Sequence, residues 1–168
     1  GLAHDRDSHV AYDATINQES LQARSRKLAA FQKTLKAPPV FGPRQGDLLV
    51  IGWGSTKGAI EEAVAGMQAQ GHKVSSMHIE FVQPLPPGIK EAMSGFKRVM
   101  TVEGNWSDPP DDKIIDETNR RYSALAMLLR ARYLVDVDCW SEVMGQPIKP
   151  GTIREVLLAK LKTLDKAA

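Results

Sequence analysis

Hydrophobic residues recur along this chain at two different spacings. From residue 47 onward, short apolar runs alternate with stretches in which apolar side chains recur every three or four residues. The first pattern is typical of buried strands and the second of amphipathic helices. The predicted strands are 48–52, 73–82, 98–103 and 133–138. The predicted helices are 57–70, a short one opened by Pro86 and Pro87, 114–132, and a last one whose capping box begins at Thr152.

This alternation of strands and helices predicts the fold class. Parallel strands need crossover connections, which are usually helices, and such helices cover both faces of the sheet. We therefore expect an α/β fold over residues 47–168, with three layers and a mostly parallel open sheet flanked by helices.

Residues 1–46 have a different character and predict a linker or arm. Apolar positions at helical spacing occur between Gln18 and Lys36, and Pro38 ends the pattern. The apolar positions are Leu21, Leu28, Phe31 and Leu35. Asn17 can cap the start of this helix. We expect its apolar stripe to pack on the body, on a neighbouring domain or on a second copy in a homodimer.

Composition narrows the class of protein. The chain is 42% hydrophobic and 25% charged, which is ordinary for a globular protein, and its net charge of +2 gives no electrostatic case for nucleic acid. It has no apolar run of the roughly 18 residues that a membrane span needs and no signal-peptide pattern. We expect a cytoplasmic protein with no membrane contact. Because the chain begins at Gly1, we also expect a piece of a longer polypeptide.

Three glycines after the first predicted strand nearly spell a dinucleotide-binding loop. Gly52, Gly54 and Gly58 have the spacing GxGxxxG, one residue longer than that loop requires, and Trp53 stands between the first two. Glu80 lies 22 residues beyond Gly58, where a ribose-binding acid is expected.

Two interpretations of this loop remain open. The favoured one is a sharp strand-to-helix turn, with Ser55 or Thr56 capping the helix. The alternative is an independent nucleotide- or anion-binding module that uses Gly52–Gly58, with a weak anion site at the amides of Gly54, Ser55 and Thr56.

The carboxyl end of the third predicted strand is the best internal candidate for a functional surface. Glu103-Gly104-Asn105-Trp106-Ser107 ends this strand, and open α/β sheets place their sites at that edge. The next stretch, "SDPPDDK", predicts an exposed loop. The arginines of the helix that follows, Arg120, Arg121, Arg130 and Arg132, are expected to reach solvent or carboxylates.

Other titratable residues give weaker signals. "HDRDSH", from His4 to His9, has metal-ligand residue types but no periodicity to hold them together, so we expect a loop or a contact with another domain. His72 and His78 have no recognisable catalytic partners. Cys139 is the single cysteine, so it cannot form an internal disulfide or bind a cluster alone, and we expect a buried thiol.

Five segments together resemble one family, the α subunits of 2-oxoacid:ferredoxin oxidoreductases, and especially the 2-oxoglutarate enzymes. They are "GLAHDRDSHVAYD", "LLVIGWGSTKGAIEEAV", "HIEFVQPLPP", "VMTVEGNWSD" and "LLRARYLVDVDCWSEVMGQPIKPGTIREVL". The pairing of GWGST with a later PLPP and VE-x-N is fairly specific. The stretch from Asp108 to Ala124 looks like an insertion relative to this pattern.

The resemblance implies a carboxy-terminal domain similar to that of transketolases. It also implies a parent complex that uses thiamine diphosphate, Mg²⁺, an iron–sulfur cluster and coenzyme A to decarboxylate a 2-oxoacid and reduce ferredoxin. The implied partners are the rest of the α subunit, a β subunit and ferredoxin. The sequence lacks the metal–diphosphate motif and the cluster cysteines. We therefore assign no catalytic residue, cofactor or metal to this domain, and expect a scaffold and interface.

Overall fold

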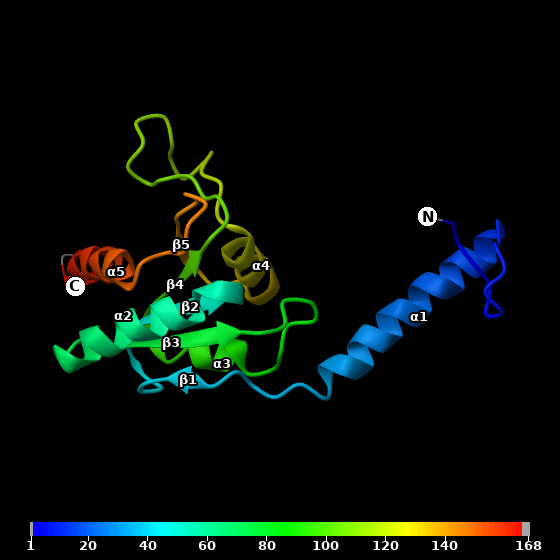
Figure 1. The fold of residues 1–168 in the computed structure, drawn as a ribbon, viewed down its shortest axis with the longest axis horizontal. Helices are drawn as coiled ribbons and strands as arrows, with labels where there is room; N and C mark the ends of the chain where they lie inside the picture. The colour runs from blue at the N-terminus through cyan, green and yellow to red at the C-terminus, as the bar shows by residue number, and fades with distance from the viewer. Residues whose placement is uncertain (1, 166–168) are drawn as a thin grey trace.

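A five-stranded sheet covered by helices on both faces forms the body of the protein, and one helix projects from it (Figure 1). The computed structural model describes residues 2–165. The sheet order is β1-β3-β2-β4-β5. The strands are β1 (Val40–Phe41), β2 (Gly46–Trp53), β3 (Val74–Ile79), β4 (Phe96–Glu103) and β5 (Asp138–Ser141).

The central strands are parallel, which confirms the fold class expected from the sequence. β2 pairs in parallel with both β3 and β4, and β4 pairs in parallel with β5. Only β1, a two-residue edge strand that the sequence did not predict, runs antiparallel to β3. The helices of the body are α2 (Lys57–Ala69), α3 (Ile89–Met93), α4 (Ala124–Tyr133) and α5 (Pro150–Asp165).

The apolar run in β2 fills both layers of the core. Successive side chains of a strand point to opposite faces. Leu48 and Val50 pack in the cluster formed with α2 and α5, whereas Leu49 and Ile51 pack in the cluster formed with α3 and α4. All four side chains are fully buried. A strand covered on both faces has no polar side, which explains the continuous apolar run in the sequence.

The predicted helix 114–132 and strand 133–138 are both wrong in their bounds. Helix α4 begins only at Ala124, because Asp112 and Asp116 accept hydrogen bonds from amides two residues later and hold the preceding stretch in turns. Leu134 ends α4 in the left-handed conformation with φ 54°. Strand β5 therefore starts at Asp138.

Helix starts also differ from the predicted ones. Helix α5 begins at Pro150, so Thr152 lies inside its first turn rather than at its cap. The projecting helix α1 (Ala14–Gln32) begins after Asp13, whose carboxylate accepts hydrogen bonds from the amides of Thr15 and Ile16. Asn17 lies within that helix and does not cap it.

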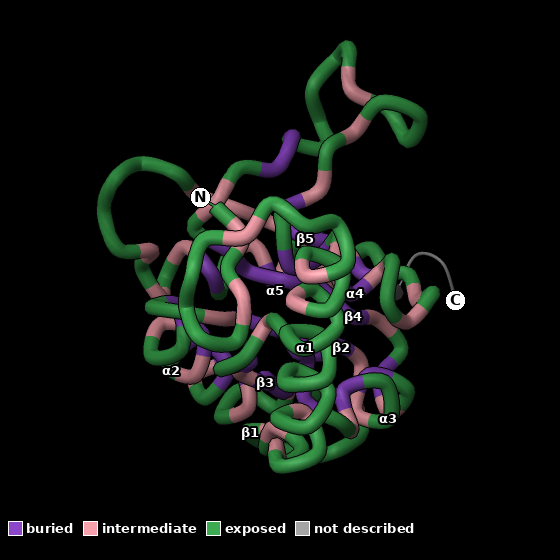
Figure 2. Tube along the Cα trace, turned by 90° about the vertical axis from the view of Figure 1, so that its right-hand side faces the viewer, coloured by how far each residue is buried: buried purple, intermediate pink, exposed green. Residues whose placement is uncertain are grey.

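Helix α1 extends away from the body and does not fold back on the helices of the sheet (Figure 1). None of its residues is buried, and Figure 2 shows it exposed along its length. Its carboxyl end meets the body at two points. The rings of Phe31 and Phe81 are 5.2 Å apart in an edge-to-face arrangement. Gln32 Nε2 donates a hydrogen bond of 2.8 Å to the carbonyl oxygen of Leu85.

Within residues 2–165, no helix is long and apolar enough to cross a membrane.

Candidate functional site

The carboxylate of Glu103 lies at the end of β4 and caps helix α4. The Leu125 amide donates to Glu103 Oε2 at 2.9 Å, and the Ala126 amide donates to Oε1 at 3.1 Å. The Asn105 side-chain oxygen accepts from the Ala124 amide at 3.0 Å. The first amides of a helix have no partner within the helix, and a negative charge is favourable there. The predicted edge segment therefore supplies the cap of the following helix.

Three side chains also donate hydrogen bonds to Glu103. Ser123 Oγ donates to Oε1 at 2.5 Å, while Asn105 Nδ2 and Trp53 Nε1 donate to Oε2 at 2.8 and 3.1 Å. Thr101 Oγ1 lies 3.3 Å from Ser123 Oγ. We call Trp53, Thr101, Glu103, Asn105 and Ser123 the Glu103 network.

The environment of Glu103 keeps its carboxylate charged. Its residue is 0% exposed, and burial by itself raises the pKa of a carboxyl group. The hydrogen bonds from Ser123, Asn105 and the Leu125 amide outweigh burial, so the pKa of Glu103 lies below its ordinary value. A carboxylate that already accepts five hydrogen bonds cannot take a proton or a metal ion without losing them. The geometry suits a structural anchor rather than a general base.

A second carboxylate, Asp108, closes the base of the loop that follows. Arg121 donates to it with two side-chain nitrogens, at 2.8 and 3.0 Å, and with its backbone amide at 2.9 Å. Trp106 Nε1 donates to the same carboxylate at 2.9 Å. The hydrogen bonds from Arg121, followed by that from Trp106, hold the pKa of Asp108 well below its usual range. This pair joins the two ends of the predicted insertion.

The edge segment is also joined to β5. The Ser107 amide donates to Ser141 Oγ at 2.9 Å, and the two hydroxyl oxygens are 2.8 Å apart. Trp106, between these anchors, remains 59% exposed. The Glu103–Ser107 segment is thus tied to α4, to β5 and to the loop, with one aromatic side chain facing outward.

The glycine loop is built for close packing of helix α2 on the sheet. A Cβ atom at Gly52 would lie 2.3 Å from Ile60 Cδ1, whereas a Cβ at Gly58 would meet nothing within 4 Å. In a dinucleotide-binding loop the third glycine permits close packing between helix and strand. In this chain the first glycine, Gly52, permits that packing. Gly54 has φ +60°, which favours glycine at the turn.

The start of α2 lacks the predicted cap from Ser55 or Thr56. A short 3-10 helix, Gly54–Thr56, precedes it, and no hydroxyl caps the helix. Thr56 Oγ1 instead donates to the carbonyl oxygen of Trp53 at 2.9 Å. The indole nitrogen of Trp53 points to Glu103. Gly54 and Ser55 are exposed, Thr56 is buried, and their weak anion site stays a prediction.

The amino-terminal "HDRDSH" segment forms a tight turn. Asp5 Oδ1 accepts hydrogen bonds from the amides of Asp7 and His9, both at 2.9 Å, and His4 forms an antiparallel bridge with Val10. Ligand atoms of Asp5, Asp7 and His9 lie within 4.8 Å of one another. A metal site here would use the carboxylate of Asp5, which already accepts the two hydrogen bonds that hold the turn together. The acidic and histidine residues of this segment therefore have a structural explanation.

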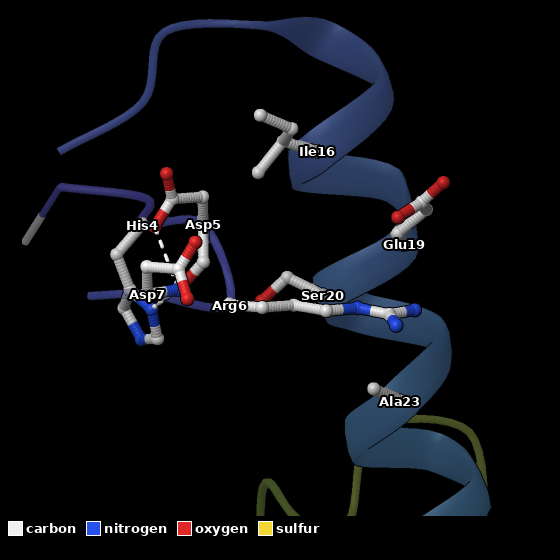
Figure 3. Close-up of a pocket in the computed structure, with 8 residues that line it drawn as sticks. All are labelled: His4, Asp5, Arg6, Asp7, Ile16, Glu19, Ser20 and Ala23. Atoms are coloured by element: carbon white, nitrogen blue, oxygen red, sulfur yellow. Dashed lines mark hydrogen bonds between the residues drawn. The ribbon is translucent and has the colours of Figure 1, made fainter. Parts of the chain in front are cut away.

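This turn and the first turns of α1 enclose an open groove of about 390 Å³ (Figure 3). Its wall on the helix side is formed by Ile16, Glu19, Ser20 and Ala23, and Arg6 extends across it toward Ser20.

The remaining titratable residues lie outside the Glu103 network. Cys139 is buried, as expected, and Arg120 donates to its carbonyl oxygen at 3.1 Å. Arg120 also pairs with Asp138 at 3.2 Å, so it reaches a carboxylate as the sequence predicted. His78 Nδ1 is buried and has no hydrogen-bond partner among the described residues. Burial, and after it the charge of Lys57, lower the pKa of His78.

Comparisons with known proteins place this arrangement in a family. Over 137 residues, or 81% of the chain, it is 32% identical to the 2-oxoglutarate oxidoreductase subunit KorA of Mycobacterium tuberculosis. Over 111 residues, or 63% of the chain, it is 28% identical to the 2-oxoacid:ferredoxin oxidoreductase subunit alpha of Saccharolobus solfataricus. The chain is homologous to part of these α subunits. It spans 18% and 17% of their lengths.

The fold of the chain also matches a solved structure. It superposes with a TM-score of 0.72 on a 2-oxoglutarate:ferredoxin oxidoreductase from Magnetococcus marinus, solved with 2-oxoglutarate, coenzyme A and succinyl-CoA bound. The match covers 94% of this chain and 25% of that chain, at 22% identity. No protein-family model matches the sequence.

Sequence reasoning found the edge segment of this α-subunit homologue but missed its partners. Ser123 and Arg121 lie 20 and 13 residues away from the carboxylates that they contact. The available signal was a glutamate directly after the mainly apolar run 99–102, because a buried carboxylate requires donors.

Proposed function

We propose that this chain is a domain of the α subunit of a 2-oxoacid:ferredoxin oxidoreductase whose substrate is 2-oxoglutarate. The 32% identity to subunit KorA over 81% of the chain carries the proposal. In the reaction, a 2-oxoacid, coenzyme A and two oxidised ferredoxins give the acyl-CoA, carbon dioxide, one proton and two reduced ferredoxins. The bond between the keto carbon and the carboxylate breaks, and a thioester bond forms at the keto carbon.

The cofactors of this reaction do not fit the residues of the chain. Thiamine diphosphate needs a Mg²⁺ site for its diphosphate, and Mg²⁺ prefers oxygen ligands that keep some of its waters. The two buried carboxylates at the sheet edge, Glu103 and Asp108, are both occupied by protein donors. An iron–sulfur cluster needs several thiolates, and Cys139 is the single cysteine. We therefore propose that thiamine diphosphate, Mg²⁺ and the cluster are held elsewhere in the complex.

The role of this domain is that of a scaffold and subunit interface. Its partners under this proposal are the remaining α-subunit domains, a β subunit and, for the whole complex, ferredoxin. The hydrogen bonds of Glu103 support this role, because they connect β2, β4 and α4 through one carboxylate and leave that carboxylate no free position for chemistry.

Two measurements test the proposal. The isolated 168-residue chain, assayed with 2-oxoglutarate, coenzyme A and an artificial electron acceptor, is expected to show no turnover above a control without protein. The native protein, purified from its source cells through a tag on this segment, is expected to bring a β subunit and to form acyl-CoA. Turnover by the isolated chain contradicts the scaffold role. A native protein without acyl-CoA formation contradicts the assignment to the oxidoreductase.

A further inference from the structure

Helix α1 carries an apolar face that nothing in the described chain covers. Leu21, Leu28 and Phe31 are 51%, 39% and 38% exposed. Their spacing of seven and three residues places them on one side of the helix. At the carboxyl end of α1, this face reaches Phe81, itself 40% exposed, through the edge-to-face ring contact. We call Leu21, Leu28, Phe31 and Phe81 the apolar track.

An uncovered helix of this kind is unstable in water. Helix α1 has 19 residues and no buried side chain, and its attachment to the body is limited to its last turn. Most of the stability of a protein helix comes from packing of its apolar face. The apolar track therefore requires a partner surface along its length.

The charged residues of α1 indicate which kind of partner surface would fit this helix. Arg24 lies between Leu21 and Leu28 on the same side of the helix, because residues three and four apart are neighbours. Among the described residues its side chain has no ion pair or hydrogen bond. Residues 14–36 contain one acidic residue, Glu19, and five basic ones, which are Arg24, Arg26, Lys27, Lys33 and Lys36.

A second copy of the chain is a poor occupant of this face. Pairing of two α1 helices through the apolar track would bury Arg24 against another basic helix, and like charges in contact are unfavourable. A groove with apolar walls and a carboxylate opposite Arg24 would satisfy both features. Recognition of an amphipathic helix by such a groove is a recurring binding mode.

We propose that α1 is a docking helix, whose apolar track and Arg24 bind an apolar groove containing at least one carboxylate, on a part of the oxidoreductase α subunit outside these 168 residues. This inference rests on the function proposed above. The chain spans only 18% of subunit KorA, so most of the surface of a related subunit lies outside the matched segment.

Amide hydrogen exchange of residues 14–32 tests the proposal. In the enzyme assembled in its source cells, exchange is expected to be at least about tenfold slower than in the isolated 168-residue chain, because docking removes the helix from water. Arg24→Glu and Leu28→Ser in the assembled enzyme are expected to restore fast exchange. Arg26→Glu is the matched control, since it makes the same charge change about 200° around the helix.

Each outcome decides the question. Slow exchange that Arg24→Glu abolishes and Arg26→Glu preserves supports the docking helix. Equal exchange in the assembled enzyme and the isolated chain overturns it, even if acyl-CoA formation is normal and the proposed function stands. If the isolated chain sediments as a dimer that Leu28→Ser dissociates, the occupant is a second copy and the proposal is wrong. If no oxidoreductase assembles around the native chain, both proposals fail.

Discussion

Trp53 Nε1 donates a hydrogen bond of 3.1 Å to Glu103 Oε2, and this contact joins the carboxyl ends of β2 and β4. The two residues are 50 positions apart in the sequence. The tryptophan within the glycine motif and the glutamate of the edge segment are therefore parts of one structural unit.

Replacing Glu103 with glutamine should destabilise the fold by about 3 kcal/mol, because a buried network built around a charge loses its acceptor. Four of the five donors to the carboxylate are nitrogens that cannot accept a hydrogen bond, so only the Ser123 hydroxyl could accept from the amide nitrogen of glutamine. Thermal unfolding should show a melting temperature lower by about 10 °C. The control is Glu80→Gln, an exposed carboxylate just after β3, which should change stability by less than about 0.5 kcal/mol. Equal effects of the two substitutions contradict the anchor role.

Stability should fall in acid because of Asp108. Its pKa in the folded protein is depressed, first of all by Arg121, whereas in the unfolded chain it is about 3.9. A depressed carboxyl pKa stabilises the fold fully above the unfolded value, and this contribution is lost as the pH falls below about 4 toward the folded value. Melting temperatures of the wild type and Asp108→Asn should differ by a constant amount above about pH 5, and this difference should shrink steadily as the pH falls below about 4. A constant difference would refute the assignment.

Two glycines of the GxGxxxG motif should respond oppositely to alanine. Gly52→Ala should destabilise by about 1 to 3 kcal/mol, since the new methyl group overlaps Ile60 and Thr56. Gly58→Ala should stabilise by about 0.5 kcal/mol, because it lies in a helix with open space around it. Urea unfolding measures both changes. A dinucleotide-binding loop, whose third glycine permits close packing between helix and strand, would instead show the larger loss of stability for Gly58→Ala.

Nucleotides should not bind tightly to the glycine loop. The spacing is one residue too long for a dinucleotide, and Gly58 makes no close contact between helix and strand. Calorimetric titration with NAD, NADP and coenzyme A should give no dissociation constant as low as about 1 μM, which corresponds to about −8 kcal/mol. Saturable binding at that level, lost in Gly54→Ala, would contradict this prediction and favour the nucleotide-binding module.

Most of the loop between Asp108 and Arg121 should be dispensable for folding. The Asp108 amide donates to the Arg121 carbonyl oxygen at 2.9 Å, so the ends of the loop are already adjacent. Replacing residues 110–119 with Asn-Gly should shift the melting temperature by less than about 3 °C, since shortening a flexible loop has a small entropic effect. In the shortened protein, Asp108→Ala should cause a larger loss. A collapse of stability on shortening alone would mean that the loop packs on the body.

The core of the fold was predictable because its signals are local and periodic. Residues 48–51 are apolar without interruption, and a strand covered on both faces requires that. The short strand β1 carries no such signal, because two residues cannot show alternation. The error at 114–132 has a chemical cause. The carboxylates of Asp112 and Asp116 accept hydrogen bonds from nearby backbone amides, and these bonds compete with those of a helix. The spacing of apolar residues contains no information about such bonds.

The sequence indicated where the Glu103 network lies, but not which residues form it. Glu103 is the last residue of a predicted strand, at the carboxyl edge of a parallel sheet, so the sequence indicated its place. Its donors come from Trp53, Ser123 and the start of α4, and only the folded sheet brings these together. The direction of α1 was equally inaccessible, since an amphipathic pattern states which face is apolar but not what covers it.

The position of Glu103 also constrains the order in which the chain folds. During synthesis Glu103 leaves the ribosome before helix α4 exists, whereas Trp53, another of its donors, has already emerged. Helix α4 has ten residues and is too short to persist alone. We expect its first turn to become stable only after β2 and β4 have paired and have positioned the carboxylate. Nascent chains that end before residue 126 therefore contain Glu103 without the α4 amides that donate to it. Such chains should bind chaperones for longer than chains that extend through α4.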